Sequence, residues 1–273
     1  MKNTLIAICL TEHDFNKFSS TIFQSIKNFE VGFNNDLDVF FRIQTKKNIE
    51  DFDLNQLKSF SYSLTNYFSV SDARNYCIDY ALSLNYKNIY FFDASIYMPP
   101  ESAAFLYKCQ FSSTGYIPRL EYSFSEPHGT NLKKNYTVKK IYPISNPFVW
   151  TFLFPVSLLS TRFDENLGPG EKTILKSGED VLFLYDVLCG RRVLQSRNDY
   201  VFHPPRGGDN TKRLIYAEGQ GCLYKRLIFH KPHPFLFFYF FLFIINTFFL
   251  AITLRKNGPK ILYYRLKGLL CKS

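Results

Sequence analysis

Residues 88–95 read NIYFFDAS, a short apolar run that ends abruptly at the carboxylate of Asp93. A run of this kind is typical of a strand buried within a parallel sheet. In open α/β sheets, ligands bind at the carboxyl ends of the strands. Asp93 is therefore expected at the rim of a crevice, where its carboxylate either holds a divalent cation or caps a turn.

Strands and helices alternate around this run. Residues 4–10 predict a buried strand, an amphipathic helix follows, and residues 38–43 predict a second strand. A helix is expected over about 71–84, and Pro99–Glu101 opens another after the 88–92 strand. This order predicts an α/β fold with a Rossmann-like, mostly parallel sheet flanked by helices.

The second half of the chain contains fewer regular patterns. Residues 191–195 and 199–203 predict two separate strands, and a helix is expected from about 211 to 230. We expect one domain over residues 1–210, which contains the sheet, and a C-terminal helical part over residues 211–273.

Charge is unevenly placed along the chain. The net charge is +10, and from residue 211 onward 11 basic residues stand against Glu218 alone. A basic block implies an anionic partner such as nucleic acid, acidic lipid or pyrophosphate. Because these basic residues bracket an apolar run and not an exposed groove, we expect acidic membrane lipids and no nucleic acid.

The apolar run covers residues 234–254, PFLFFYFFLFIINTFFLAITL. As a helix it would be about 31 Å long, close to the ~30 Å core of a bilayer. Basic residues stand on both sides: Lys225, Arg226, Lys231, Arg255, Lys256, Lys260, Arg265 and Lys267. The positive-inside rule disfavours export of either end, so an in-plane or re-entrant segment is expected, with a single span as the alternative. Asn246-Thr247 would suit a bend, and residues 261–270 predict an amphipathic interfacial helix.

A second chemical motif joins residues 163–170, FDENLGPG, to residues 178–180, GED. The glycine-rich loop delivers Glu179 and Asp180 to the first turn of a helix, where the helix dipole favours an ionised carboxylate. An ionised Asp180 can accept the proton of an attacking hydroxyl. The alternative is an ordinary acidic helix N-terminus.

Two further residues stand where ligand contacts are common. His203 ends a predicted strand and is either a metal or phosphate contact or a histidine bonded to backbone. Arg74 lies at a helix start within SDARN, residues 71–75, and either binds phosphate or the base or lies on the surface.

Taken together and in this order, these stretches resemble family 2 glycosyltransferases with the GT-A fold. The matching segments are residues 4–12, 72–75, 89–95, 163–170, 178–180 and 201–204. The resemblance is greatest to bacterial enzymes that build capsule, lipopolysaccharide or related cell-surface glycans.

The resemblance implies roles for individual residues. Asp93, Ala94 and Ser95 would stand where the family places its metal-binding D-x-D motif, and His203 would match a late metal or diphosphate contact. The implied donor contacts are Thr11, Glu12, Arg74, Asp93, Ala94 and Ser95. Asp180 would be the base of an inverting displacement, and Glu179 would help to orient the acceptor.

Two departures from the family pattern bear on these roles. Ser95 replaces the second carboxylate of D-x-D, so the ion is held either with the help of Ser95 or mainly by the diphosphate and His203. Family members often carry an acid after the second strand to hold the nucleoside. Here residues 42–47 read RIQTKK.

These residues lead us to expect a metal-dependent glycosyltransferase that uses Mn²⁺ or Mg²⁺ and a nucleotide-sugar donor, most simply a UDP-sugar. The expected acceptor is a glycan or a polyprenyl-diphosphate-linked glycan. Six cysteines without C-x-x-C spacing indicate a reducing compartment. The expected location is the cytoplasmic face of a bacterial inner or plasma membrane, with peripheral or monotopic attachment. The alternative is a non-catalytic, GT-A-like membrane scaffold subunit of a glycan-synthesis complex.

Overall fold

The computed structural model describes residues 2–47, 55–110, 115–124, 136–188, 190–204, 210–230, 232–253 and 257–271. The strands are β1 (Thr4–Thr11), β2 (Leu37–Gln44), β3 (Ser61–Thr65), β4 (Asn88–Phe92), β5 (Ile117–Ser123), β6 (Tyr136–Lys139), β7 (Leu153–Pro155) and β8 (Val193–Phe202). The helices are α1 (Glu12–Gly32), α2 (Val70–Ser83), α3 (Pro100–Gln110), α4 (Glu179–Leu188), α5 (Asn210–His230), α6 (Pro234–Thr253) and α7 (Gly258–Leu270).

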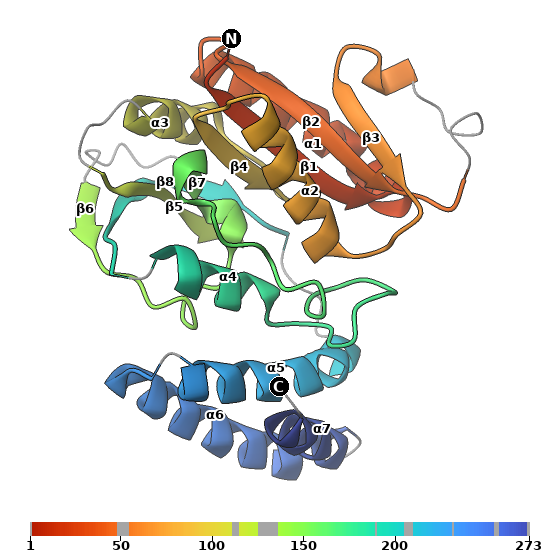
Figure 1. Ribbon diagram of the computed structural model, residues 1–273, viewed down its shortest axis with the longest axis vertical. Helices are drawn as coiled ribbons and strands as arrows, with labels where there is room; N and C mark the ends of the chain where they lie inside the picture. The colour runs from red at the N-terminus through yellow and green to blue at the C-terminus, as the bar shows by residue number, and fades with distance from the viewer. Residues whose placement is uncertain are drawn as a thin grey trace.

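The main sheet has the strand order β3-β2-β1-β4-β7. Strands β3, β2, β1 and β4 are parallel, and β7 runs antiparallel to β4. Side chains of β1 alternate between the two faces: Ile6 and Ile8 pack with α1, and Leu5 and Ala7 pack with α2. Helices therefore cover both faces (Figure 1), which explains the apolar runs of the strands. The predicted α/β fold with a mostly parallel sheet flanked by helices is confirmed.

A smaller sheet, β5-β8-β6, adjoins the main one. Strand β8 runs unbroken, so the prediction of two separate strands over 191–195 and 199–203 is wrong. The reason is a local bond inside the strand: Ser196 Oγ donates to Asp199 Oδ2 at 2.6 Å and accepts from the Asp199 N–H at 3.0 Å. These two polar side chains between the predicted strands therefore bond to each other within β8, and the pairing with β5 shifts register between Arg119 and Glu121.

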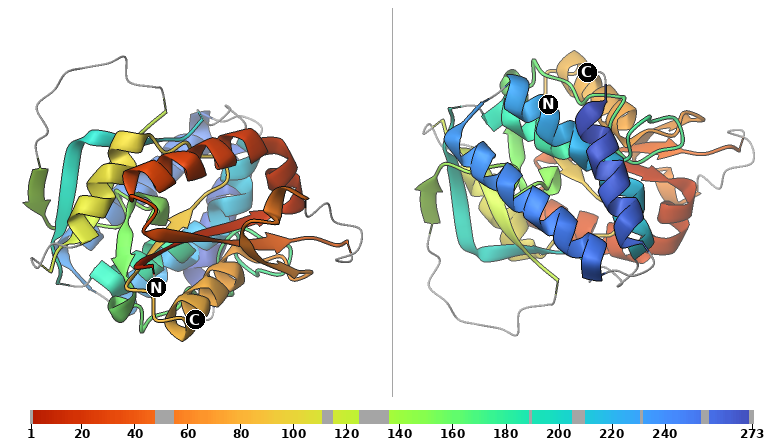
Figure 2. Two further views of the ribbon diagram at one scale, coloured as in Figure 1. Left: turned by 90° about the horizontal axis from the view of Figure 1, so that it is seen from above. Right: turned by 90° about the horizontal axis from the view of Figure 1, so that it is seen from below.

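The C-terminal helices form a layer at one end of the molecule. Helix α5 lies between the sheets and the pair α6 and α7 (Figures 1 and 2). Helices α5 and α7 touch through glycines: a Cβ added to Gly221 would lie 2.1 Å from the carbonyl oxygen of Arg265. Ser177 Oγ donates to the carbonyl of Tyr216 in α5 at 2.9 Å. The layer is therefore attached to the loop that precedes α4.

Helix α6 is long and apolar enough to cross a membrane, with a mean hydropathy of 2.4 over its most apolar 18 residues. It runs as one helix through Asn246 and Thr247, so the bend expected there is absent (Figure 2). The Thr247 hydroxyl is satisfied without a bend, because it donates to the Phe243 carbonyl at 2.6 Å and accepts from Arg265 at 2.9 Å. The flanking residues Lys231, Arg255 and Lys256 lie outside the described residues.

Candidate active site

The turn after β4 places Asp93 and Ser95 in contact. Asp93 Oδ1 accepts from the backbone N–H of Ser95 and lies near its hydroxyl, both at 3.2 Å. Ser95 Oγ lies 3.2 Å from Nε2 of His203, which follows β8. Ala94, between the two polar residues, is buried in the core on the α1 side of the sheet. Residues 108 positions apart in the chain therefore meet at the carboxyl end of β4.

The ring of His203 is held from three sides. Its Nδ1 lies 2.6 Å from the carbonyl oxygen of Pro204, which can only accept, so Nδ1 carries the proton in the neutral ring. The lone pair is then on Nε2, toward Ser95. The ring also stacks on buried Trp150, with centroids 5.8 Å apart, and meets the ring of Phe124 edge-on. His203 thus presents an acceptor nitrogen in a fixed orientation.

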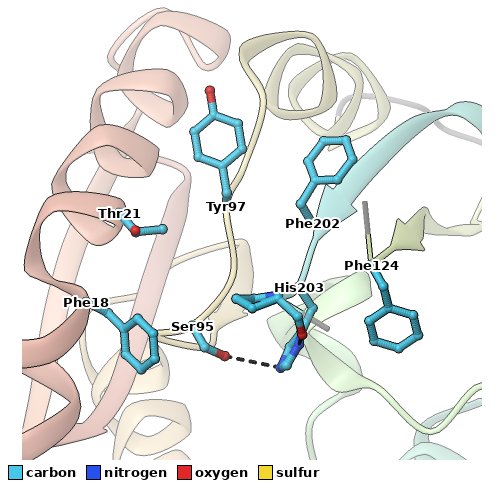
Figure 3. Close-up of a pocket in the computed structure, with 8 residues that line it drawn as sticks. Phe18, Thr21, Ser95, Tyr97, Phe124, Phe202 and His203 are labelled. Carbon is cyan, nitrogen blue, oxygen red and sulfur yellow. Dashed lines mark hydrogen bonds between the residues drawn. The ribbon is translucent and has the colours of Figure 1, made fainter. Parts of the chain in front are cut away.

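An aromatic pocket adjoins this turn (Figure 3). Its volume is about 280 Å³, and its lining residues are Phe18, Thr21, Ser95, Tyr97, Phe124, Phe202, His203 and Pro204. Figure 3 shows Phe18 and His203 on either side of Ser95. Aromatic walls beside polar groups are suited to a ligand with one apolar face and several hydroxyls.

Arg74 and Asp180 form a buried ion pair on the α2 side of the site. Arg74 Nη1 donates to Asp180 Oδ1 at 2.5 Å, and the side chains are 10% and 17% exposed. Burial raises the pKa of Asp180, whereas Arg74 and the backbone N–H of Val149 lower it and the charge of Asp93 adds to the increase. The net pKa of Asp180 lies above its usual value, and the influence of Asp93 puts the two carboxylates in one electrostatic environment.

Arg74 also experiences the charges of the other carboxylates. Burial lowers its pKa, the charges of Asp180, Glu179 and Asp93 raise it, and the net change is upward. Arg74 is therefore a permanent cation. Its position at the second turn of α2 follows from Ser69, whose hydroxyl accepts the Asp72 N–H and caps the helix.

Glu179 lies next to Asp180 but points into the protein. A Cβ added to Gly168 would lie 3.0 Å from the carboxyl carbon of Glu179 and 3.1 Å from Ser71 Oγ. Burial, followed by the charge of Asp180, raises the pKa of Glu179 to about 8. Of these two adjacent carboxylates, Asp180 is the one that pairs with Arg74.

Side chains of α2 hold the loop over residues 163–178 in place, through contacts that the sequence did not predict. Asn75 donates to the Phe163 carbonyl at 3.0 Å and accepts its N–H at 2.8 Å, and Ser71 donates to the Leu167 carbonyl at 2.7 Å. Gly170 has φ +150°, and a Cβ there would lie 2.3 Å from the Phe68 carbonyl oxygen. These contacts bring the start of α4 to Arg74.

A second pocket, of about 390 Å³, lies where β1 and β2 end. We call it the β1–β2 pocket; its lining residues are Thr11, Glu12, His13, Asn16, Gln44, Thr45, Lys46 and Phe68. Glu12 is already paired, with Lys47 at 2.5 Å and with the Thr45 hydroxyl at 2.6 Å. The amide nitrogen of buried Gln44 has no hydrogen-bond partner within the described chain. An unpaired buried amide is costly unless a ligand or water satisfies it.

The expected site residues therefore fall into three neighbouring groups. Asp93, Ser95 and His203 touch one another, Arg74 and Asp180 pair beside Glu179, and Thr11 and Glu12 line the β1–β2 pocket. Across the described residues, no three His, Cys, Asp or Glu side chains gather as a metal-binding group. Sequence patterns missed Trp150, the Val149 N–H and Gln44, because nothing in their local sequence signals a contact with residues so distant in the chain.

A parallel sheet with a carboxylate after β4, covered by helices and followed by a glycine-rich loop and an acidic helix start, is the GT-A architecture. Solved structures of S. aureus TarS share this fold. TarS 1–349 has a TM-score of 0.54 and 15% identity, and the match covers 84% of this chain and 66% of that chain. For TarS 1–349 in complex with UDP-GlcNAc the TM-score is 0.54, with 14% identity and coverage of 84% and 67%.

The match to the longer TarS chain covers 40% of it, with a TM-score of 0.53 and 13% identity. No protein-family model and no curated protein sequence matches the chain. At these identities the similarity establishes the fold alone.

Proposed function

We propose that this protein is an inverting glycosyltransferase that moves a sugar from a nucleotide-diphosphate donor to a hydroxyl of a glycan acceptor. The observation that supports this most is the buried Arg74–Asp180 pair, which lies within electrostatic reach of Asp93 at the carboxyl end of the main sheet. A carboxylate paired with a fixed cation is suited to general-base catalysis, because the cation favours the ionised form that accepts a proton.

In the proposed reaction Asp180 accepts the proton of the acceptor hydroxyl. The hydroxyl oxygen forms a bond to the anomeric carbon of the donor sugar, on the face opposite the diphosphate. The bond between that carbon and the diphosphate oxygen breaks, and its electron pair leaves with the nucleoside diphosphate. One displacement of this kind inverts the anomeric configuration. Arg74 orients Asp180, and Glu179 is proposed to help orient the acceptor.

The β1–β2 pocket is proposed to bind the nucleoside of a UDP-sugar, near Thr11 and Glu12. The unpaired Gln44 amide supports this assignment, because it is a hydrogen-bond donor suited to a carbonyl oxygen of uracil. Arg74 is proposed to lie near the diphosphate. TarS, which shares the fold, has been crystallised with UDP-GlcNAc and with UDP.

Asp93, Ser95 and His203 are proposed to hold Mn²⁺ or Mg²⁺ together with the diphosphate. Asp93 Oδ1 and His203 Nε2 each lie 3.2 Å from Ser95 Oγ. A carboxylate, a hydroxyl and an imidazole are groups that would hold such an ion, with diphosphate oxygens as its further ligands. The ion would neutralise charge on the departing diphosphate.

For the acceptor and the cellular location, the proposal is the same as the expectation from the sequence. We propose a lipid-linked glycan, such as a polyprenyl-diphosphate-linked one, presented at the cytoplasmic face of a bacterial membrane. The apolar helix α6 and the basic C-terminal part support a membrane location. Membership of family 2 and a role in capsule or lipopolysaccharide synthesis are part of the same proposal.

Two observations favour a second candidate, a non-catalytic GT-A-like scaffold subunit. Ser95 stands in place of a second carboxylate, and the described residues contain no group of three His, Cys, Asp or Glu side chains placed to hold a metal ion. A protein that had lost metal-dependent catalysis would show both features.

A panel of nucleotide sugars, with and without Mn²⁺, separates the two candidates. A ligand at 100 times its Kd stabilises the fold by about 2.7 kcal/mol, which a thermal-melting assay detects. We expect stabilisation by a UDP-sugar that increases with Mn²⁺, followed by release of UDP when an acceptor is added. Binding without UDP release under any acceptor condition would support the scaffold, and no nucleotide binding at all would contradict the proposed donor class.

A further inference from the structure

Helix α6 exposes an apolar stripe along its whole length. The exposed large side chains of this stripe recur at helical spacing and include Phe238, Phe241, Leu242, Ile245, Phe248, Phe249 and Ile252. The opposite stripe is buried against α5 and α7 and consists of Leu236, Phe243, Thr247 and Leu250. A soluble surface rarely carries a contiguous apolar stripe of this size, so the outer stripe requires a partner.

The inner side of α6 carries a polar contact at its midpoint. Arg265 of α7 donates to Thr247 at 2.9 Å and to Asn246 at 3.2 Å, both in the middle of α6. The same guanidinium donates twice to Gln220 Oε1 of α5, at 3.1 and 2.9 Å. Its carbon also lies 4.7 Å from the ring centroid of Phe243. One buried cation therefore joins all three helices.

This contact restricts the orientation that α6 can take in a bilayer. If α6 crossed the membrane, Asn246 and Thr247 would lie at the bilayer centre and would bring Arg265 and Gln220 with them. A charged guanidinium is disfavoured there. Helix α5 would follow, although it is bound to the rest of the protein by the Arg226–Asp164 ion pair. An in-plane position avoids both problems, because the outer stripe alone enters the membrane.

Helix α7 is suited to the same surface. Its exposed side chains include Tyr263, Leu266 and Leu270, interleaved with the exposed lysines Lys260 and Lys267. Tyrosine and lysine beside apolar residues are typical of a helix at the lipid–water interface. Figure 2 shows α6 and α7 side by side across the end of the molecule, with α5 behind them. Residues 211–273 carry 11 basic residues and a single acidic one, which favours anionic headgroups.

We propose that α6 and α7 form an in-plane membrane dock, in which the outer stripe of α6 enters one leaflet of an anionic bilayer and α6 does not cross it. The partner is the lipid surface itself. The inference builds on the proposed membrane location and is independent of the proposed reaction.

Depth-dependent quenching tests the orientation directly. Phe238, Ile245 and Ile252 lie on one stripe, are 56%, 49% and 80% exposed, and are separated by seven residues, or about 10 Å, along the helix. Each would be replaced singly, as Phe238→Trp, Ile245→Trp or Ile252→Trp, in the full chain. The variants would be bound to phosphatidylglycerol-containing vesicles with lipids brominated at different acyl positions. The signal of the native Trp150 would be subtracted.

We expect the same shallow depth, within about 10 Å of the headgroups, at all three positions. A Trp at Val31, exposed on α1, is the matched control and should not be quenched. If position 245 lies about 10 Å deeper than 238 and 252, α6 spans the membrane and the in-plane inference is wrong, although the membrane location stands. If none is quenched, the membrane location fails as well.

A second variant tests the exposed apolar stripe of α6 without an introduced tryptophan. Phe241→Glu places a charge on its centre, and we expect at least a tenfold loss of vesicle affinity with unchanged UDP-sugar hydrolysis in solution. Val31→Glu is the control and should bind vesicles as the native protein does. Equal affinity of Phe241→Glu and the native protein would contradict the dock.

Discussion

At the residue scale, Arg74 is central to the electrostatics of the site, because its charge lowers the pKa of both Asp180 and Glu179. The pair with Asp180 is buried, so the energetic effect of breaking it is larger than for a surface pair. Two opposing effects act on the pKa of Asp180: burial raises it, and the charge of Arg74 lowers it.

This balance predicts the pH dependence of activity. The base must be ionised, so activity falls as pH falls through the pKa of Asp180. Arg74→Gln removes a charge that lowers this pKa, and we expect the acid limb of kcat/KM to move upward by about one pH unit or more. Arg162→Gln, which breaks the exposed Arg162–Asp79 pair of 2.7 Å, is the matched control and should leave the limb in place. Coincident limbs for the two variants would contradict the role of Arg74.

The raised pKa of Glu179 predicts that the stability of the folded protein depends on pH. The sign of this dependence is opposite to the one that a typical surface carboxylate gives. Its pKa is raised to about 8 in the folded protein from an ordinary value of 4.5. Between these values the folded state retains a proton that the unfolded state loses, so the free energy of unfolding decreases as pH rises. Glu179→Gln should therefore be more stable than the native protein at pH 9, and the difference should shrink toward pH 5.

Denaturant unfolding at several pH values measures this difference. Glu101→Gln is a suitable control, because Glu101 is an exposed acid in the first turn of α3. A stability difference for Glu179→Gln that does not change with pH would show that the carboxyl group titrates normally.

At the element scale, the loop over 163–178 positions α4 through its backbone. Gly170→Ala would place a Cβ 2.3 Å from the Phe68 carbonyl oxygen, at φ +150°. We expect a loss of more than about 2 kcal/mol of stability, since both the clash and the backbone strain oppose folding. Gly190→Ala has φ +70°, with no described atom within 4 Å of the added Cβ, and should cost only about 1 kcal/mol. Equal melting temperatures for the two variants would contradict this account of the loop.

The same elements show how far the sequence could lead. Apolar periodicity located β1, β2, β4 and α1, because each buries a regular face in one of two cores. It failed at β8, where a Ser196–Asp199 bond keeps polar residues inside a strand. Motif spacing identified Asp93, Asp180, Arg74 and His203 as candidates. Their mutual contacts depend on residues such as Trp150 and Asn75, whose roles arise only from packing between distant segments.

At the scale of the whole molecule, α5 connects the C-terminal layer to the site. Its Gly219 would clash with Ser177, two residues before Glu179, if it carried a Cβ, and its Gly221 would clash with Arg265. The layer and the loop before α4 are therefore in direct backbone contact, which sets the distance between the proposed membrane surface and the proposed base.

The integrity of this layer depends on Arg265. Arg265→Met leaves Gln220, Asn246 and Thr247 without their shared donor. We expect a loss of about 2–4 kcal/mol, because buried polar groups without partners are costly. Hydrogen exchange across α6 should accelerate, while exchange in β1 and β4 stays slow. Lys260→Met, at an exposed position of α7, the helix that contains Arg265, is the control and should leave hydrogen exchange unchanged.

Asp180 is proposed to be the base of a nucleotide-sugar transferase, and one variant tests this role most directly. Asp180→Asn is compared with the native protein for sugar transfer from a UDP-sugar, with UDP binding measured by calorimetry on the same samples. General-base catalysis contributes about 10²- to 10⁴-fold, so we predict a loss of transfer of that size with UDP binding retained. A folded Asp180→Asn protein that binds UDP and transfers sugar at the native rate would contradict the assignment.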